Sequence, residues 1–255
     1  MNLFLMGLSV AGAESIRAEN RILKSLSVKP AVVTKGPLVS VIIPAYNEER
    51  YLPALLTSLG NQSYSPIEVI VVDNLSDDNT IKVAKEFGAK VMVNPTPANV
   101  NKSRNIGASA ARGEYLAFID ADTIPESNAI LNSVTALQNG ADLVYTNKCS
   151  TDDHLISIAR VIVGWLDPVN HTATGCYLMT NRDVFNSVSG FDESLNPMTS
   201  RQEDGKALTA RLVESGYNVV MLKGTYVGTS ARRFHAEGYS TSSLWQERSI
   251  RALRR

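Results

Sequence analysis

The run from Glu114 to Asp122 constrains the fold of this chain most, because it is a short apolar stretch that ends in two carboxylates. Its length and its aromatic and aliphatic residues predict a buried strand. Asp120 and Asp122 then follow where open α/β sheets place their ligand crevice. Neighbouring carboxylates repel unless a cation lies beside them, and Mg²⁺ is typically held by carboxylates together with substrate phosphates. The motif predicts a metal-dependent site for a phosphorylated ligand; the alternative is a polar turn with Asp122 as a helix cap.

Apolar strands alternate with helical patterns through the first half of the chain. We expect strands at residues 38–44, 67–73, 90–93 and 115–120, and helices at about 49–60, 78–87, 101–111 and 127–139. This alternation predicts an α/β fold with a mostly parallel central sheet that helices cover on both faces. After Gly140 the alternation weakens, and we expect strands at 142–146, 174–180 and 218–222 with helices at 182–187 and 203–215.

Length and composition fit one large domain. A chain of 255 residues with 44% hydrophobic and 20% charged residues is ordinary for a globular protein. The formal net charge is zero, so no general attraction to nucleic acid is expected. Cys149 and Cys176 are too few for a disulfide framework and favour a reduced, cytoplasmic setting. No apolar run reaches the roughly 18 residues that a membrane-spanning helix needs.

Polar groups follow three successive predicted strands, in the order Tyr46-Asn47-Glu48, Asp73-Asn74 and Asp120-Ala121-Asp122, and the helix at 101–111 carries Arg104 just before the third. This ordered set resembles the family 2 glycosyltransferases, which have a Rossmann-like GT-A fold. The resemblance runs from about Val39 to about Gly238. It implies an inverting hexosyltransferase that uses Mn²⁺ or Mg²⁺ and moves a sugar from a nucleotide-diphosphate donor to a hydroxyl of a polysaccharide, a lipid-linked acceptor or another glycan.

We expect the chain to divide into three segments, of which the resemblance covers only the middle one. Residues 1–36 form an N-terminal helix and linker, and the helix packs on the domain, on a partner or at a membrane surface. Residues 37–238 form the transferase domain, with a nucleotide-binding half at 37–125 and an acceptor half at 140–238. Residues 239–255 form a basic helix, whose arginines either face solvent or make peripheral contact with anionic lipid at the cytoplasmic face of a membrane.

The implied nucleotide site draws on all three strand ends and on two later arginines. Its members are Pro44, Ala45, Tyr46, Glu48, Asp73, Asn74, Arg104, Asp120, Arg232 and Arg233. By resemblance Asp122 is the direct metal ligand, Asp120 contacts the ribose and reaches the metal, and His235 is a further metal ligand. Asn74 departs from the two aspartates that many relatives carry, and an amide can both donate and accept, so the base stays open. Turn chemistry and solvated surface are the alternative explanations for these side chains.

The acceptor half carries three matching segments. Thr174 to Met179 resembles the family's glycine-containing strand beneath the donor sugar, which implies sugar or acceptor contacts for Gly175, Cys176 and Tyr177. Gly190-Phe191-Asp192-Glu193 resembles a second segment, and Gln202-Glu203-Asp204 matches an acidic pair at a helix start. Carried over, Asp204 is the catalytic base, with Glu203 as the fallback. Acids at a helix N-terminus are also favoured by the helix dipole alone.

Two other functions remain open on the residues. A nucleotidyltransferase of related fold would need a basic, glycine-rich loop after the first strand, whereas residues 44–50 are acidic and contain no glycine. A non-catalytic nucleotide-sugar-binding scaffold would not need the aspartate pair, Arg104 and Asp204 together. The chain contains no GxxxxGK[ST] and no GxGxxG, which argues against P-loop enzymes and dinucleotide dehydrogenases.

Overall fold

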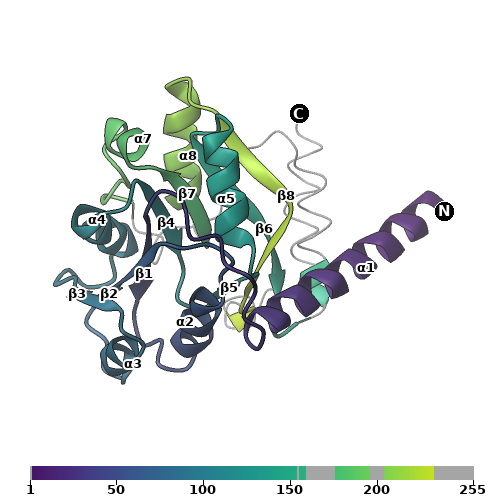
Figure 1. Ribbon diagram of the computed structural model, residues 1–255, viewed down its shortest axis with the longest axis horizontal. Coiled ribbons are helices and arrows are strands. Elements are labelled where there is room, and N and C mark those ends of the chain that lie inside the picture. Colours follow the sequence, from purple (N-terminus) through teal and green to yellow (C-terminus); the bar gives the residue numbers. More distant parts are fainter. Residues whose placement is uncertain (1, 154, 159–175, 196–203, 233–255) are drawn as a thin grey trace.

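The computed structural model describes residues 2–153, 155–158, 176–195 and 204–232 (Figure 1). Its helices are α1 (Asn2–Ser25), α2 (Leu52–Gly60), α3 (Thr80–Glu86), α4 (Val100–Ala110), α5 (Ala129–Gln138), α7 (Arg182–Ser187) and α8 (Asp204–Glu214). Its strands are β1 (Val39–Ala45), β2 (Ile67–Asp73), β3 (Lys90–Val93), β4 (Tyr115–Ile119), β5 (Thr123–Pro125), β6 (Leu143–Ser150), β7 (Tyr177–Asn181) and β8 (Val219–Thr229).

The described strands form one sheet in the order β3-β2-β1-β4-β7-β6-β8-β5. The first four strands in this order are all parallel. Strand β7 is antiparallel to both β4 and β6, while β6 and β8 are parallel and β5 closes the row antiparallel to β8. The expected α/β fold class is confirmed, and the wholly parallel part of the sheet is the part built from the first half of the chain.

Helices cover both faces of the sheet, and alternate residues of the central strands point to opposite faces. Val41 and Ile43 of β1 pack with the apolar residues of α2 and α5. Ile42, between them, packs in a second cluster with residues of α7 and α8. Burial on both faces explains why these strands read as continuous apolar runs rather than as alternating ones.

Helix α4 lies unusually close to the parallel strands. A Cβ placed on Gly107 would lie 2.4 Å from the Cγ2 of Ile42, so only glycine permits this separation. Asn99 caps the helix, because its side chain accepts a hydrogen bond from the Lys102 backbone N–H at 2.9 Å. The close approach holds Arg104, one turn before Gly107, against the end of the sheet.

The N-terminal helix α1 packs on the opposite end of the sheet, beside β6 and β8, and extends beyond the body of the domain (Figure 1). A stripe of mostly small residues recurs every three or four positions and is buried: Ala11, Ser15, Ala18, Ile22 and Ser25. The expected N-terminal helix is therefore present and packs on the domain over this stripe. Within the described residues, no helix combines the length and the apolar character needed to cross a bilayer.

Strand β8 departs most from expectation. The sequence predicts a strand over 218–222, but β8 continues to Thr229. It does so through Gly224, whose φ of +78° an L side chain rarely adopts, and the ladder with β6 shifts register between Thr146 and Asn147. The short strand β5 was not expected either, and it pairs with the extension of β8. These two additions bring the segment ending at Arg232 to the ends of the parallel strands.

Candidate functional site

The ends of β1, β2 and β4 lie side by side, at Ala45, Asp73 and Ile119. Ala45 pairs directly with Asp73 across the ladder, and β1 lies between β2 and β4. We call this the carboxyl edge. The polar groups that follow the three strands therefore come together, as the sequence predicts, on the side where open α/β sheets bind ligands.

Two loops of the carboxyl edge, residues 46–50 and 74–79, are joined by side-chain to backbone hydrogen bonds. Asn47, at a positive φ of 55°, accepts a hydrogen bond from the Asp77 N–H at 2.8 Å, and its own N–H donates to the Ser76 hydroxyl at 2.9 Å. The Glu48 N–H donates to Thr80 Oγ1 at 2.8 Å. Further bonds connect Glu49 with Asp78 and Asn79. We call this pair the joined loops.

The residues of β1 and β2 at this edge differ in exposure. Pro44 and Ala45 are buried strand residues, whereas Tyr46 projects half-exposed at 50%. Asp73 is 1% exposed, and its Oδ2 accepts a hydrogen bond from the Ser76 N–H at 3.1 Å. Its Oδ1 is buried without a hydrogen-bond partner among the described residues. A buried carboxylate oxygen of this kind can accept a hydrogen bond from a ligand.

Asn74 has a different environment. Its amide donates to the carbonyls of Asn94 at 3.2 Å and Thr96 at 2.7 Å, and its oxygen accepts from the Asn99 N–H at 3.1 Å. Both amide hydrogens are therefore engaged within the protein, which leaves one acceptor position on the oxygen for a ligand. In this structure Asn74 holds the segment that leads into α4.

Arg104 contacts the first aspartate of the pair. Its Nη2 lies 2.8 Å from Asp120 Oδ1, its Nη1 donates to Asn101 Oδ1 at 3.3 Å, and its guanidinium lies 5.1 Å from the centre of the Phe191 ring. The Arg104 side chain is 2% exposed while that of Asp120 is 28% exposed. Arg104 is thus buried beneath Asp120 and holds that carboxylate from the protein side.

Arg232 contacts the second aspartate. Its Nη2 lies 3.2 Å from Asp122 Oδ2 and also forms an ion pair with Glu48 Oε1, while its guanidinium lies 4.4 Å from the Tyr51 ring centre. The other Asp122 oxygen lies 3.5 Å from Thr229 Oγ1. Burial raises the pKa of Glu48, and the hydrogen bond from Arg232 opposes that rise. One guanidinium thus bridges two nearly buried carboxylates.

Cys176 and Tyr177 lie on the inner side of this edge. The Cys176 carbonyl accepts a hydrogen bond from the Asp120 N–H at 3.2 Å, so its backbone supports the aspartate pair. Tyr177 is fully buried with its hydroxyl 2.9 Å from Ser133 Oγ, and burial raises the pKa of this phenol. Its ring belongs to the core beneath α5 and does not join the exposed side chains of the site.

Of five further residues that the sequence predicts for the site, the structure describes only Asp204. Asp204 is the first residue of α8, which packs Leu208 and Leu212 against the sheet. The remaining four lie outside the described residues: Gly175, Glu203, Arg233 and His235.

The donor set at the carboxyl edge suits a hard divalent cation. Among the described residues, no three acidic, histidine or cysteine side chains converge as a complete metal site. Mg²⁺ and similar ions, however, commonly take one or two carboxylates and complete their shell with substrate phosphates and water. Asp120 and Asp122, which follow the same strand, are the two carboxylates that fit this pattern. Glu48 Oε2 is buried without a hydrogen-bond partner in the described part of the chain.

Two contributors at the edge were missed from sequence: Tyr51, which lies under Arg232, and Thr229, which contacts Asp122. Glu48 and Arg232 were both expected in the nucleotide site, but their ion pair across 184 positions was not. No local sequence pattern marks Tyr51 or Thr229 as site residues, because Tyr51 lies in an ordinary turn and Thr229 in an ordinary strand. Only the length of β8 brings them together.

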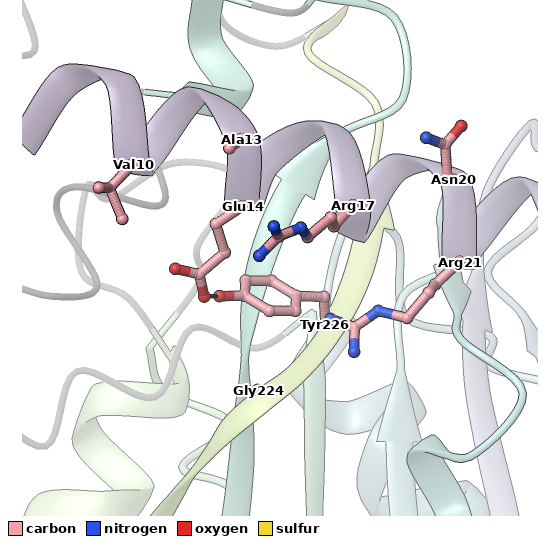
Figure 2. A pocket seen from close by; sticks show the side chains of 8 residues that line it. All are labelled: Val10, Ala13, Glu14, Arg17, Asn20, Arg21, Gly224 and Tyr226. Carbon is pink, nitrogen blue, oxygen red and sulfur yellow. Dashed lines mark hydrogen bonds between the residues drawn. The ribbon is translucent and has the colours of Figure 1, made fainter.

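A separate hollow of about 760 Å³ lies between α1 and β8 (Figure 2). Figure 2 shows Glu14 accepting a hydrogen bond from the Tyr226 hydroxyl, with Arg21 beside the same ring at 5.4 Å from its centre. Arg21 also pairs with the buried Glu126 at 3.1 Å, and burial raises the pKa of Glu126 to about 7. These side chains already satisfy one another, so we assign this hollow to the docking of α1 rather than to the candidate site.

Comparison with known proteins gives the family. The model of "Glycosyl transferase family 2" matches residues 40–188, more than half of the chain. An uncharacterized glycosyltransferase of Haemophilus influenzae is 34% identical over 122 residues, which are 46% of this chain and 49% of that protein. The chain therefore spans about half the length of this curated relative.

Solved structures show the same fold at low identity. The mannosyltransferase PcManGT of Pyrobaculum calidifontis, in complex with GDP-Man and Mn²⁺, superposes with a TM-score of 0.65 at 20% identity, covering 89% of this chain and 67% of that one. Residues 1–349 of Staphylococcus aureus TarS, in complex with UDP-GlcNAc, give 0.60 at 19% identity, with 75% and 58% covered. With the family match over residues 40–188, this chain belongs to glycosyl transferase family 2.

Proposed function

We propose that this glycosyltransferase moves a sugar from a nucleoside-diphosphate donor to an acceptor hydroxyl, with inversion at the anomeric carbon. The observation that carries the proposal is the carboxyl edge, where Glu48, Asp73, Asp120 and Asp122 gather with Arg104 and Arg232. The neighbours bound to GDP-Man and UDP-GlcNAc support a donor of this class. Family membership favours glycosyl transfer over nucleotidyl transfer.

In this proposal the nucleotide binds at the ends of β1 and β2. The exposed ring of Tyr46 is placed to stack on a base, and the unpartnered Asp73 Oδ1 is placed to accept a hydrogen bond from it or from the ribose. Asn74 contributes the remaining acceptor position of its side-chain oxygen, and it holds the segment that leads into α4 beside the nucleotide.

The diphosphate lies, in our proposal, against Asp120 and Asp122. These carboxylates would hold Mn²⁺ or Mg²⁺, which supplies neutralisation of the charge that develops on the departing diphosphate. Arg104 orients Asp120 from below through their 2.8 Å ion pair. Arg232, with Arg233 and His235 after it, is the basic segment available to the phosphates.

The acceptor side completes the reaction. The acceptor oxygen attacks the anomeric carbon opposite the diphosphate, the bond from that carbon to the diphosphate oxygen breaks, and the hydroxyl proton passes to a general base. We assign the base to Asp204 at the start of α8, with Glu203 as the alternative. The Gly175–Tyr177 backbone would form the floor below the sugar, because the Cys176 carbonyl already holds the Asp120 N–H.

We propose a cytoplasmic setting, which is supported by Cys149 and Cys176 being buried free thiols. We propose that Arg248, Arg251, Arg254 and Arg255 give it peripheral contact with anionic lipid, at about 1 kcal/mol for each residue near the surface. Such contact would suit a lipid-linked acceptor. Vesicle binding that is unchanged after deletion of residues 248–255 would exclude this role.

Thermal-shift titration with UDP-, GDP- and dTDP-sugars in the presence of Mn²⁺ or Mg²⁺ tests the donor class. A ligand at 100 times its dissociation constant stabilises the folded chain by about 2.7 kcal/mol, which gives a readily measured shift. Asp122→Ala should abolish the metal-dependent part of that shift while leaving the unliganded melting temperature near wild type. Full metal-dependent binding by Asp122→Ala would refute the metal assignment.

Asp204→Asn tests the catalytic base. The variant should keep donor and metal affinity but transfer sugar at least about 100-fold more slowly, the usual contribution of a positioned general base. Asparagine can still cap a helix, so a purely structural role would survive the change. A rate defect in Glu203→Gln but not in Asp204→Asn would move the base by one residue. Donor binding without any transfer by the wild type would favour a scaffold.

A further inference from the structure

Arg232 occupies the position where a cation would approach Asp122. Its Nη2 reaches both Asp122 Oδ2, at 3.2 Å, and Glu48 Oε1, so one guanidinium nitrogen bridges the two carboxylates. Both carboxylate side chains are 12% exposed and Arg232 is 30% exposed. The open side of this cluster is therefore the arginine side.

The two carboxylates offer more acceptor capacity than Arg232 uses. Glu48 Oε2 is buried without a hydrogen-bond partner among the described residues, and Asp122 Oδ1 has only a 3.5 Å contact with Thr229 in the described structure. Two carboxylates and one guanidinium also leave one uncompensated negative charge. A divalent ion would neutralise the pair fully, but its approach to Asp122 would bring it against Arg232.

Arg232 also contacts the ring of Tyr51, and a cation at Asp122 would not disturb that contact. Its guanidinium lies over the Tyr51 ring, 4.4 Å from the centre, and Tyr51 is the residue before α2. An arginine held by an aromatic face can turn its N–H groups from one anion to another without losing that contact. A diphosphate beside Asp122 would be such an anion, since guanidinium binds phosphate oxygens well.

We propose that Arg232 is an exchangeable counter-ion that excludes divalent cations from Asp122 until a nucleoside diphosphate arrives with them. The proposal rests on the function proposed above, in which Asp122 is a metal ligand. Without nucleotide, a cation must displace Arg232 from two carboxylates and then lie next to its positive charge. With nucleotide, Arg232 transfers to a diphosphate oxygen. Metal and nucleotide therefore bind cooperatively, and Arg232 is the source of part of that coupling.

Mn²⁺ binding to the full chain tests this without any turnover. Free Mn²⁺ is measured by electron paramagnetic resonance during titration, first with protein alone and then with saturating UDP or GDP. Arg232→Gln removes the charge and keeps the length of the side chain. We expect it to bind Mn²⁺ alone about tenfold more tightly than wild type, equivalent to removing one competing ion pair of about 1.4 kcal/mol. The nucleotide-induced gain in Mn²⁺ affinity should shrink correspondingly.

Two further variants make the result interpretable. Arg232→Lys keeps the positive charge and should stay close to wild type, whereas Arg112→Gln removes an exposed arginine that pairs with Glu68 elsewhere and should change nothing. The proposed exchange of Arg232 for a cation would be overturned if Arg232→Gln bound Mn²⁺ no more tightly than wild type and kept the wild-type gain in Mn²⁺ affinity on adding nucleotide. Two other outcomes would instead refute the proposed function. One is wild-type protein that binds neither UDP nor GDP in the presence of Mn²⁺, and the other is an Asp122→Ala variant that still binds Mn²⁺ normally.

Discussion

The two aspartates that follow β4 each contact an arginine, and the surroundings of the two arginines are opposite. Arg104 is almost fully buried under a partly exposed Asp120, whereas Arg232 is partly exposed above a nearly buried Asp122. If the buried guanidinium of Arg104 moved away, it would leave a charge without a partner inside the protein. The Arg104–Asp120 pair is therefore a fixed part of the fold. An exposed guanidinium can be replaced from solvent, so the second pair can exchange its cation. Two adjacent arginine–aspartate pairs thus have different roles: the Arg104–Asp120 pair supports the fold, and the Arg232–Asp122 pair is available for ligand binding.

Arg104→Met should show the largest effect on folding. The change leaves Asp120 and Asn101 Oδ1 without their buried donor, and we expect a loss of about 3 kcal/mol in the free energy of unfolding. Arg232→Met should cost less than Arg104→Met, because Arg232 itself is 30% exposed and water can take its place beside Glu48 and Asp122. Urea unfolding with an unchanged m-value measures both. Equal losses would show that burial does not separate the two pairs.

A third pair, Arg21 with Glu126, extends the comparison, since here the carboxylate is the buried partner. The side chain of Glu126 is 6% exposed and that of Arg21 is 47% exposed. Burial raises the pKa of Glu126 from the ordinary 4.5 to about 7, so the folded state binds the proton more tightly than the unfolded one. The free energy of unfolding should therefore fall as pH rises from about 4.5 to about 7, by about 3 kcal/mol.

Glu126→Gln should remove this part of the pH dependence. Glutamine keeps an acceptor for the Tyr226 N–H, which Glu126 Oε1 accepts at 3.3 Å, but it does not titrate. Melting temperatures measured at steps between pH 5 and pH 8 should decline less in the variant than in wild type. Parallel curves for the two proteins would mean that Arg21 keeps Glu126 ionised throughout.

The smallest effect is expected at Arg112, which pairs with Glu68 at 2.9 Å while 78% exposed. Arg112→Ala should lower the free energy of unfolding by about 0.5 kcal/mol, because Glu68 keeps its hydrogen bonds from Ser40 and from the Arg112 backbone N–H. The same urea titration serves as the measurement. A loss as large as that in Arg104→Met would make exposure a poor guide to the strength of these pairs.

The parallel half of the sheet could be predicted from sequence because each of its signals is local. Continuous apolar runs mark β1, β2 and β4. The polar residues at the end of these runs, Asp73 and Asp120 among them, lie at the carboxyl edge as expected. Arg104 was expected to face the donor, and its position beside Asp120 depends on the close approach of α4 at Gly107.

The later half could not be predicted as well, because its geometry depends on long-range pairing. Lys223 and Gly224 read as the end of a strand, yet a register shift lets β8 continue to Thr229. No local feature links Glu48 with Arg232, which meet only because β8 runs that far. Tyr177 was expected at the sugar, and its burial follows from the alternation of β7 residues between the faces of the sheet.

The joined loops have a consequence for the speed and the entropy of donor binding. Hydrogen bonds within the chain itself tie residues 46–50 to residues 74–80, so these segments move together and little backbone freedom is left to lose on binding. Association with the nucleotide end of the donor should then be limited by diffusion and orientation rather than by loop closure. Any slow step would fall to the phosphate end, where an ion pair must first open.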